Sequence, residues 1–239
     1  VSPGFPFHYK GETLPIPDTI ARKTAQKSLA VTHLNRRSGR LATFPTGSGA
    51  EKILMKQSLY ITATGPSSGK SAIALGVMQL LSGVTGKIAI FRPIIPLPQL
   101  DDKDPDIHLM LEYFKLDQNY ADTFAYTEDE AYEIIAKEST TALQESILNK
   151  FKSLQEKYDF VLCLGTDFRG KDPVFEFNLN AEIAGNLNSP VLLVVGGKDM
   201  SLPEIRQTIQ TSMLDMVKHC DVAATIINRV SLSRAELDS

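Results

Sequence analysis

Ser58-Leu-Tyr-Ile-Thr-Ala-Thr-Gly-Pro-Ser-Ser-Gly-Lys-Ser71 is the stretch that decides the fold. It begins with an apolar, β-prone run and continues through a loop of small residues between Gly65 and Gly69. Apolar residues at helical spacing follow it. A strand, a glycine-rich loop and a helix in this order favour phosphate binding, because loop amides and the helix N-terminus converge on the anion. In such a loop Lys70 reaches the terminal phosphates and Ser71 ligates Mg²⁺.

The spacing of the two glycines differs from that of the standard phosphate-binding loop, G-x-x-x-x-G-K-[ST]. Three residues separate Gly65 from Gly69, and Thr64 stands where the first glycine is usual. The alternative is a tight strand-to-helix turn that contains Gly-Lys-Ser by coincidence. Because the strand, the loop and the helix follow one another in the order that phosphate-binding loops require, we expect phosphate binding. Whether the chain also turns over a nucleotide is a separate question. The residues expected to contact the phosphates are Gly65, Ser67, Ser68, Gly69, Lys70 and Ser71.

The composition is that of an ordinary globular protein. The 239 residues are 43% hydrophobic and 22% charged, which suits one sizeable domain. A formal net charge of −3 argues against a general nucleic-acid binder, and no apolar run is long enough to span a membrane. Cys163 and Cys220 lie in or beside apolar runs, so we expect buried thiols rather than a disulfide or a metal site. Such cysteine usage favours a reducing, cytoplasmic compartment.

Residues 1–54 differ from the rest of the chain. Residues 1–56 hold nine Lys/Arg against three Asp/Glu, and the first 17 residues contain four prolines. We expect an irregular basic extension with at most a short helix around residues 20–34. The extension is interpreted either as an organellar transit peptide or as sequence upstream of a natural start at Met55.

From residue 55 to residue 230 strands and helices alternate. The expected strands cover residues 57–63, 86–93, 124–126, 160–164, 190–195 and 222–228, with Pro93 ending the second. The expected helices cover residues 69–82, 105–114, 128–136, 140–157, 178–187 and 202–218. Near-continuous Val/Ile/Leu strands with interposed helices predict a three-layer α/β fold, a mainly parallel sheet with helices on both faces. Ligands of such sheets bind beyond the carboxyl ends of the strands.

Further pieces of sequence carry a family resemblance. They are Leu75-Gly-Val-Met78, Phe91-Arg-Pro93, Leu179-Asn-Ala-Glu-Ile-Ala184 and Asn228 after the last strand. Together with the loop, they resemble dethiobiotin synthetase-type P-loop proteins. The closer resemblance, over residues 56–230, is to the N-terminal dethiobiotin synthetase-like domain of long bacterial phosphate acetyltransferases.

The resemblance implies a P-loop NTPase-like fold, with ATP and Mg²⁺ as candidate ligands, Ser71 on the metal and Asn228 on adenine. Two departures are visible. Leu164 replaces the acidic residue that a dethiobiotin synthetase carries at the end of its third strand. Arg92 replaces its substrate lysine, and an arginine can bind an anion but cannot act as a neutral amine. These departures argue against ligase activity, and we expect no catalytic residue in this segment.

By resemblance, the segment has a regulatory and assembly role in a homo-oligomeric phosphate acetyltransferase and binds a nucleotide or another anionic metabolite. Acetyl transfer between acetyl-CoA and phosphate would belong to a C-terminal acetyltransferase domain, and residues 231–239 would be a tail or a linker to it. One alternative is a stand-alone ATP-dependent ligase of dethiobiotin synthetase type. Another is a non-catalytic nucleotide-sensing module of a different partner.

The loop after the third central strand holds further charged residues. Asp167 is a candidate substitute for the missing acid, and Arg169 and Lys171 are candidate anion ligands. For all three residues the sequence favours a solvated loop over a role in binding.

An acidic run follows the second strand. It comprises Asp101, Asp102, Asp104 and Asp106, which suggests a metal site. The run lacks the glycine and the glutamate of a calcium loop, so the sequence favours a flexible acidic loop.

Overall fold

Six parallel strands form the central sheet in the part of the chain that the structure describes. The computed structural model describes residues 6–9, 12–15, 58–96, 103–137, 139–166 and 173–231. In spatial order the strands are β5, β4, β6, β3, β7 and β8, and every neighbouring pair is parallel. Their bounds are Ser58–Ala63 for β3, Ile88–Ile95 for β4, Phe124–Thr127 for β5, Phe160–Leu164 for β6, Val191–Gly196 for β7 and Val222–Asn228 for β8.

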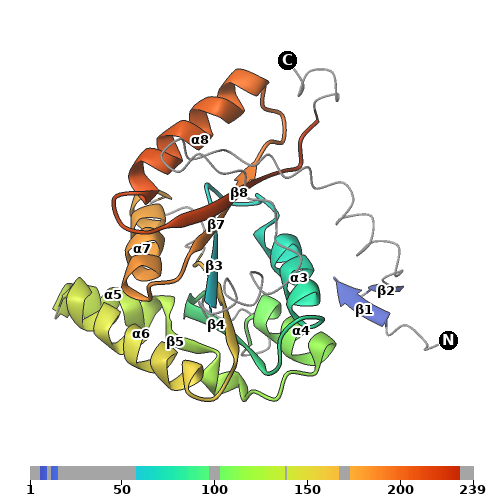
Figure 1. Ribbon diagram of the computed structural model, residues 1–239, viewed down its shortest axis with the longest axis vertical. Helices are drawn as coiled ribbons and strands as arrows, with labels where there is room; N and C mark the ends of the chain where they lie inside the picture. Colours follow the sequence, from blue (N-terminus) through green and yellow to red (C-terminus); the bar gives the residue numbers. More distant parts are fainter. Residues whose placement is uncertain are drawn as a thin grey trace.

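Helices connect these strands and cover both faces of the sheet. Their bounds are Lys70–Leu81 for α3, Pro105–Phe114 for α4, Glu128–Lys137 for α5, Thr140–Gln155 for α6, Pro173–Asn186 for α7 and Leu202–Met216 for α8, with a 3-10 turn at Tyr120–Asp122. Figure 1 shows α3 and α4 on one side of the sheet and α5, α6 and α7 on the other. The predicted three-layer α/β fold with a parallel sheet is confirmed.

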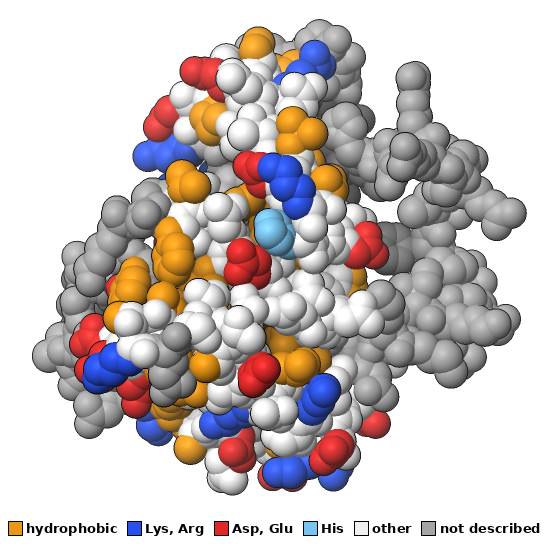
Figure 2. Space-filling view, turned by 90° about the vertical axis from the view of Figure 1, so that its left-hand side faces the viewer, with side chains coloured by type: hydrophobic (Ala, Val, Ile, Leu, Met, Phe, Trp, Pro, Cys, Tyr) orange, Lys and Arg blue, Asp and Glu red, His pale blue; other side chains and the backbone are white. Residues whose placement is uncertain are grey.

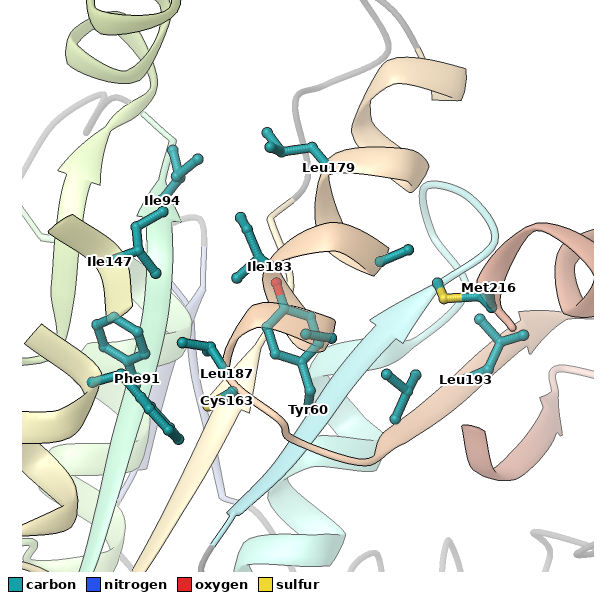
Figure 3. Packing of buried hydrophobic residues seen from close by; sticks show 14 of the residues in the cluster. Tyr60, Phe91, Ile94, Ile147, Cys163, Leu179, Ile183, Leu187, Leu193 and Met216 are labelled. Atoms are coloured by element: carbon teal, nitrogen blue, oxygen red, sulfur yellow. The ribbon is translucent and has the colours of Figure 1, made fainter. Parts of the chain in front are cut away.

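Two separate hydrophobic clusters pack the two faces of the sheet, because successive strand residues point to opposite faces. Tyr60 belongs to the cluster with α5, α6, α7 and α8, whereas its neighbour Ile61 belongs to the cluster with α3 and α4. Figure 3 shows Tyr60 of β3 beside Ile183 of α7 and beside Leu187, which directly follows that helix. Burial on both faces explains why the four inner strands, β3, β4, β6 and β7, are nearly continuous apolar runs.

β3 lies between β6 and β7, so the loop at residues 64–69 leaves the sheet near its middle. From β3 the chain continues through α3 toward β4 and β5 at one edge, and later passes from β6 to β7 and β8 at the other edge. A reversal of this kind leaves a crevice at the carboxyl ends of the strands, where open α/β sheets bind ligands. The fold therefore places the glycine-rich loop at the expected binding edge.

β4 is longer than predicted. It continues through Pro93 to residue 95, so the prediction that the proline ends it is wrong. The amide of Arg92 donates to the carbonyl of Thr123, directly before β5. Because the backbone groups of successive residues in a strand point to opposite neighbouring strands, those of Pro93 point toward β6. The pairing of β4 with β6 ends at Phe91, so the missing amide of the proline removes no ladder hydrogen bond.

The other elements agree with the sequence more closely. α4 and β8 have the predicted bounds, residues 105–114 and 222–228. α7 begins at Pro173 rather than at residue 178, because proline fits the first turn of a helix.

Two short strands lie in the N-terminal segment that the sequence predicted to be irregular. β1, Pro6–Tyr9, pairs antiparallel with β2, Glu12–Pro15. The overlooked signal is the two-residue connection Lys10-Gly11 between runs that contain β-prone residues, which is typical of a hairpin. The expected helix at residues 20–34 lies outside the described residues, so both interpretations of the extension stay predictions.

Both cysteines are unpaired thiols, as predicted. Cys163 is buried in the sheet, and Cys220 is half-buried beyond the end of α8. Burial raises the pKa of both thiols, that of Cys220 to about 11, so neither is a reactive thiolate near neutral pH. In the described segments no helix is both long enough and apolar enough to cross a bilayer.

The surface charges are mixed in sign. On the described part of the face that α5, α6 and α7 cover, basic and acidic side chains are interspersed (Figure 2). A nucleic-acid-binding face instead gathers basic residues in one stripe or patch. The distribution on this face agrees with the small net charge of −3.

Candidate functional site

The loop between β3 and α3 has the backbone shape of an anion-binding turn. Ser67 and Gly69 are left-handed, with φ of 57° and 86°. Gly69 tolerates this conformation because it has no Cβ. A Cβ at this position would also lie 2.2 Å from Asn228 Nδ2, so a larger residue would collide with the end of β8. α3 begins at Lys70, and its first amides, which lack partners within the helix, face the loop.

The loop surrounds a cavity of about 260 Å³. Its lining residues are Gly65, Ser67, Ser68, Gly69, Lys70, Ser71 and Arg229. Among these described residues there are glycines, serines and cations but no carboxylate. Amides, hydroxyl groups and positive charge suit a polyanion such as a phosphate chain. The structure thus brings together the six loop residues named from the sequence, and their contact with phosphate stays a prediction.

Lys70 is buried at the inner wall of this cavity. Its Nζ donates a hydrogen bond to the carbonyl oxygen of Gly165, directly after β6. The residue is 4% exposed, so its charge acts on a neighbouring anion with little screening by water. Leu164, which stands in place of the family's acidic residue, is buried in the cluster under α3 and α4. The leucine therefore contributes packing and offers no charge to the site.

An ion-paired network lies beside Ser71. Ser71 Oγ donates to Asp106 Oδ2 at 2.9 Å, and Arg92 Nη1 lies 3.4 Å from the same oxygen. Arg92 Nη1 also donates to Asp104 Oδ2 at 2.7 Å, and both side chains of this pair are almost fully buried. Asp104 is in addition the N-cap of α4, where its Oδ1 accepts a hydrogen bond from the Ile107 amide at 3.0 Å. One carboxylate therefore serves both as helix cap and as counter-charge.

For Asp104 and Asp106 the prediction of a flexible acidic loop is wrong. These carboxylates hold the start of α4 against Arg92, because a buried guanidinium needs a counter-charge. Arg92, which the sequence named as an anion ligand, is engaged by them and is not among the residues that line the cavity. Outside the described residues lie Asp101, Asp102, Asp167, Arg169 and Lys171, so their interpretations stay predictions.

The end of β8 contacts the loop from a second side. Asn228 Nδ2 donates to the carbonyl of Ser68 at 2.9 Å, and Arg229 Nη1 donates to the carbonyl of Ser67 at 2.6 Å. The structure thus places the Asn228 side chain on the loop backbone, and its contact with adenine stays a prediction. From the sequence, Arg229 was a candidate only by its position at the end of the last strand, because a single basic residue after a strand carries no distinguishing pattern.

Oxygen donors suited to a divalent cation are few among the residues described. No group of three or more His, Cys, Asp and Glu side chains there forms a metal site. Ser71 Oγ and Asp106 Oδ2 nevertheless lie side by side. Mg²⁺ takes oxygen ligands and keeps several waters, so two protein oxygens beside a phosphate chain fit its usual coordination.

Comparison with known proteins identifies relatives of part of the chain. A family model described as an AAA domain matches residues 57–236. Phosphate acetyltransferase from Nitratidesulfovibrio vulgaris is 47% identical over 184 residues, which are 76% of this chain and 26% of that protein. Phosphate acetyltransferase from Synechocystis sp. is 37% identical over 177 residues, which are 74% of this chain and 25% of that protein. The chain therefore spans about a quarter of the length of these relatives.

Solved structures resemble the chain more distantly. The BceF tyrosine kinase domain matches with a TM-score of 0.43 and 14% identity, over 75% of this chain and 73% of that one. A ParA family ATPase from Chlorobium tepidum matches with a TM-score of 0.41 and 14% identity, over 75% of this chain and 77% of that one.

Proposed function

Because this chain belongs to the AAA-domain family and its relatives are phosphate acetyltransferases, we propose that it is a nucleotide-binding regulatory domain of a longer phosphate acetyltransferase. In that enzyme acetyl-CoA and phosphate would be converted to acetyl phosphate and CoA by another part of the polypeptide. A nucleotide or similar polyanion in the loop cavity would adjust that reaction or the assembly of subunits.

The lining of the cavity is the observation that carries this proposal. Two cationic side chains, Lys70 and Arg229, border a cavity whose other described lining residues are glycines and serines. The N-terminus of α3 adds partial positive charge at the same place, where its first amides have no acceptor within the helix. A di- or triphosphate matches this set, because it combines several negative charges with many acceptor oxygens.

Mg²⁺ would accompany such a nucleotide. Ser71 and Asp106 are the residues that would hold it, since their oxygens are adjacent beside the cavity. When bound, the metal neutralises and orients the phosphate oxygens. The protein contributes the placement of the two oxygens, which depends on the contact between α3 and α4.

The same contacts favour a binding role over a ligase reaction. Arg92 stands in place of a substrate lysine, but it is almost fully buried and ion-paired with Asp104. Leu164 stands in place of an acid and is buried in the core. Neither side chain is therefore placed to act on a substrate. The unpaired thiols support a cytoplasmic location, and homo-oligomeric assembly is a further part of the proposal.

An assay of acetyl phosphate formation by the longer polypeptide, with and without Mg²⁺ and ATP, tests this function. We expect the nucleotide to change the rate or the KM for phosphate by roughly 5-fold or more, the usual size of allosteric coupling. Lys70→Ala should remove the response, because its charge is lost from the cavity. Lys198→Ala is the matched control, since Lys198 is an exposed lysine outside the cavity lining and its loss should leave the response intact.

A response that survives in Lys70→Ala would contradict the proposed regulation by this cavity. Release of ADP that depends on a diamine-like substrate would instead support the ligase alternative.

A further inference from the structure

Two consecutive residues at the end of β8 hold two consecutive carbonyl groups of the glycine-rich loop. Asn228 donates to Ser68 O at 2.9 Å, and Arg229 donates to Ser67 O at 2.6 Å. The partners are 160 and 162 residues apart in the chain, so the contacts depend on the folded sheet. They reach the part of the loop that lines the cavity.

The direction of the loop amides follows from these two contacts. In a planar trans peptide the carbonyl of one residue and the amide of the next point in opposite directions. With the carbonyls of Ser67 and Ser68 held by the end of β8, the amides of Ser68 and Gly69 are turned to the other side of the backbone. Loop amides that point in a fixed direction are the groups that bind phosphate in such a loop.

The loop needs such support because its backbone is strained. Ser67 has φ 57°, a conformation that is costly for a residue with a Cβ. Arg229 is itself left-handed, with φ 60°, so the chain bends directly after β8. Strained residues persist where the surrounding structure fixes them. Here the hydrogen bond between Arg229 and Ser67 joins two such residues.

The support is rigid because β8 is fixed to its neighbour in the sheet. Asn228 pairs with Gly196 of β7, and its carbonyl accepts a hydrogen bond from the Gly197 amide at 2.7 Å. The backbone of Ser68 packs closely on Gly196. A Cβ added to Gly196 would lie only 3.2 Å from Ser68 Cα. The loop is therefore packed against the end of β7 as well as bonded to β8.

We propose that Asn228 and Arg229 are positioning residues that keep the Ser68 and Gly69 amides directed at a bound phosphate before the ligand arrives. This inference rests on the proposed phosphate binding and assigns to Asn228 a role that does not involve the nucleobase. Preorganisation of this kind raises affinity, because ordering of the loop no longer opposes binding. Arg229 in addition brings positive charge to the edge of the cavity.

Binding of ATP, GTP and inorganic tripolyphosphate to Asn228→Leu tests the inference. Leucine has nearly the shape of asparagine but cannot donate to Ser68. We expect the affinities for all three ligands to fall by a common factor of about ten, which corresponds to a hydrogen bond at the upper end of the usual range. If Asn228 instead recognises adenine, ATP affinity falls, tripolyphosphate affinity stays unchanged and the ratio of ATP to GTP affinity shifts. That result would overturn the inference.

Arg229→Met and Arg206→Met are matched variants, because each removes one positive charge from the protein. Arg206 is an exposed residue of α8 that does not line the cavity. We expect Arg229→Met to weaken tripolyphosphate binding about tenfold, whereas Arg206→Met changes it little. If both variants weaken tripolyphosphate binding equally, the loss comes from the lower net charge of the protein. That result would count against positioning by Arg229.

The nucleotide-free protein provides a readout that does not depend on any ligand. NMR order parameters of the Ser68 and Gly69 amides should be those of rigid backbone in the wild type and should drop in Asn228→Leu. Amides that stay rigid in Asn228→Leu would refute the positioning role. A wild type that keeps rigid amides but binds none of the phosphates would refute phosphate binding while leaving the loop contacts intact.

Discussion

Asp104→Ala is expected to lower the free energy of unfolding by about 3–5 kcal/mol, the usual cost of leaving one partner of a buried ion pair without the other. Asp104 and Arg92 are almost fully buried, and their contact of 2.7 Å is shielded from water. The substitution also removes the N-cap of α4, because Asp104 Oδ1 accepts a hydrogen bond from Ile107. Urea unfolding of the wild type and the variant measures the difference.

Two further variants separate the causes of this loss. Asp104→Asn keeps an oxygen that can cap α4 but removes the charge, so most of the loss should remain. Asp106→Asn removes the second, more exposed carboxylate, which lies 3.4 Å from Arg92, and should cost about 1 kcal/mol or less. An Asp104→Ala variant that is as stable as Asp106→Asn would show that the buried pair does not hold α4 in place.

Gly69→Ala is expected to abolish phosphate binding and to destabilise the fold by about 1–3 kcal/mol. Gly69 has φ 86°, which disfavours any residue with a Cβ. The added methyl group would lie 2.2 Å from Asn228 Nδ2, so the loop or the end of β8 has to move. Thermal unfolding measures the stability, and titration with tripolyphosphate measures the loss of binding.

Gly65→Ala is the matched control for this substitution. Gly65 does not have the positive φ of Gly69, and a Cβ at Gly65 meets nothing within 4 Å. Its replacement should therefore change stability by about 0.5 kcal/mol or less. Removing the obstructing side chain in Gly69→Ala/Asn228→Ala should restore part of the lost stability, because the steric cause disappears while the backbone strain remains. Equal stability of the two single alanine variants would contradict the steric account.

The fold was predictable because its signals are local. Apolar runs and helical periodicity lie within single elements, so α4 and β8 were predicted at their observed bounds. The end of β4 was not predictable in the same way. Whether Pro93 interrupts the strand depends on which neighbouring strand its missing amide faces, and that is decided by the pairing of β6.

The candidate site was predictable in part for the same reason. The six loop residues are close in sequence, so one motif brings them together. The contact of Ser71 with Asp106 joins residues 35 positions apart, and the contact of Ser67 with Arg229 joins residues 162 positions apart. No spacing rule in one sequence links such residues. The sequence therefore identified the loop and named Asn228 and Asp106 as candidates, but it did not indicate that these side chains contact the loop and the start of α3.

Isothermal titration of the chain with ATP in the presence of Mg²⁺ tests the central claim most directly, namely that the loop cavity binds a phosphate chain. The wild type should bind with a dissociation constant in or below the millimolar range, and Lys70→Ala should bind at least about tenfold more weakly, because a buried ammonium is lost from the cavity wall. Absence of binding by the wild type at millimolar ATP, or equal binding by wild type and Lys70→Ala, would contradict the claim.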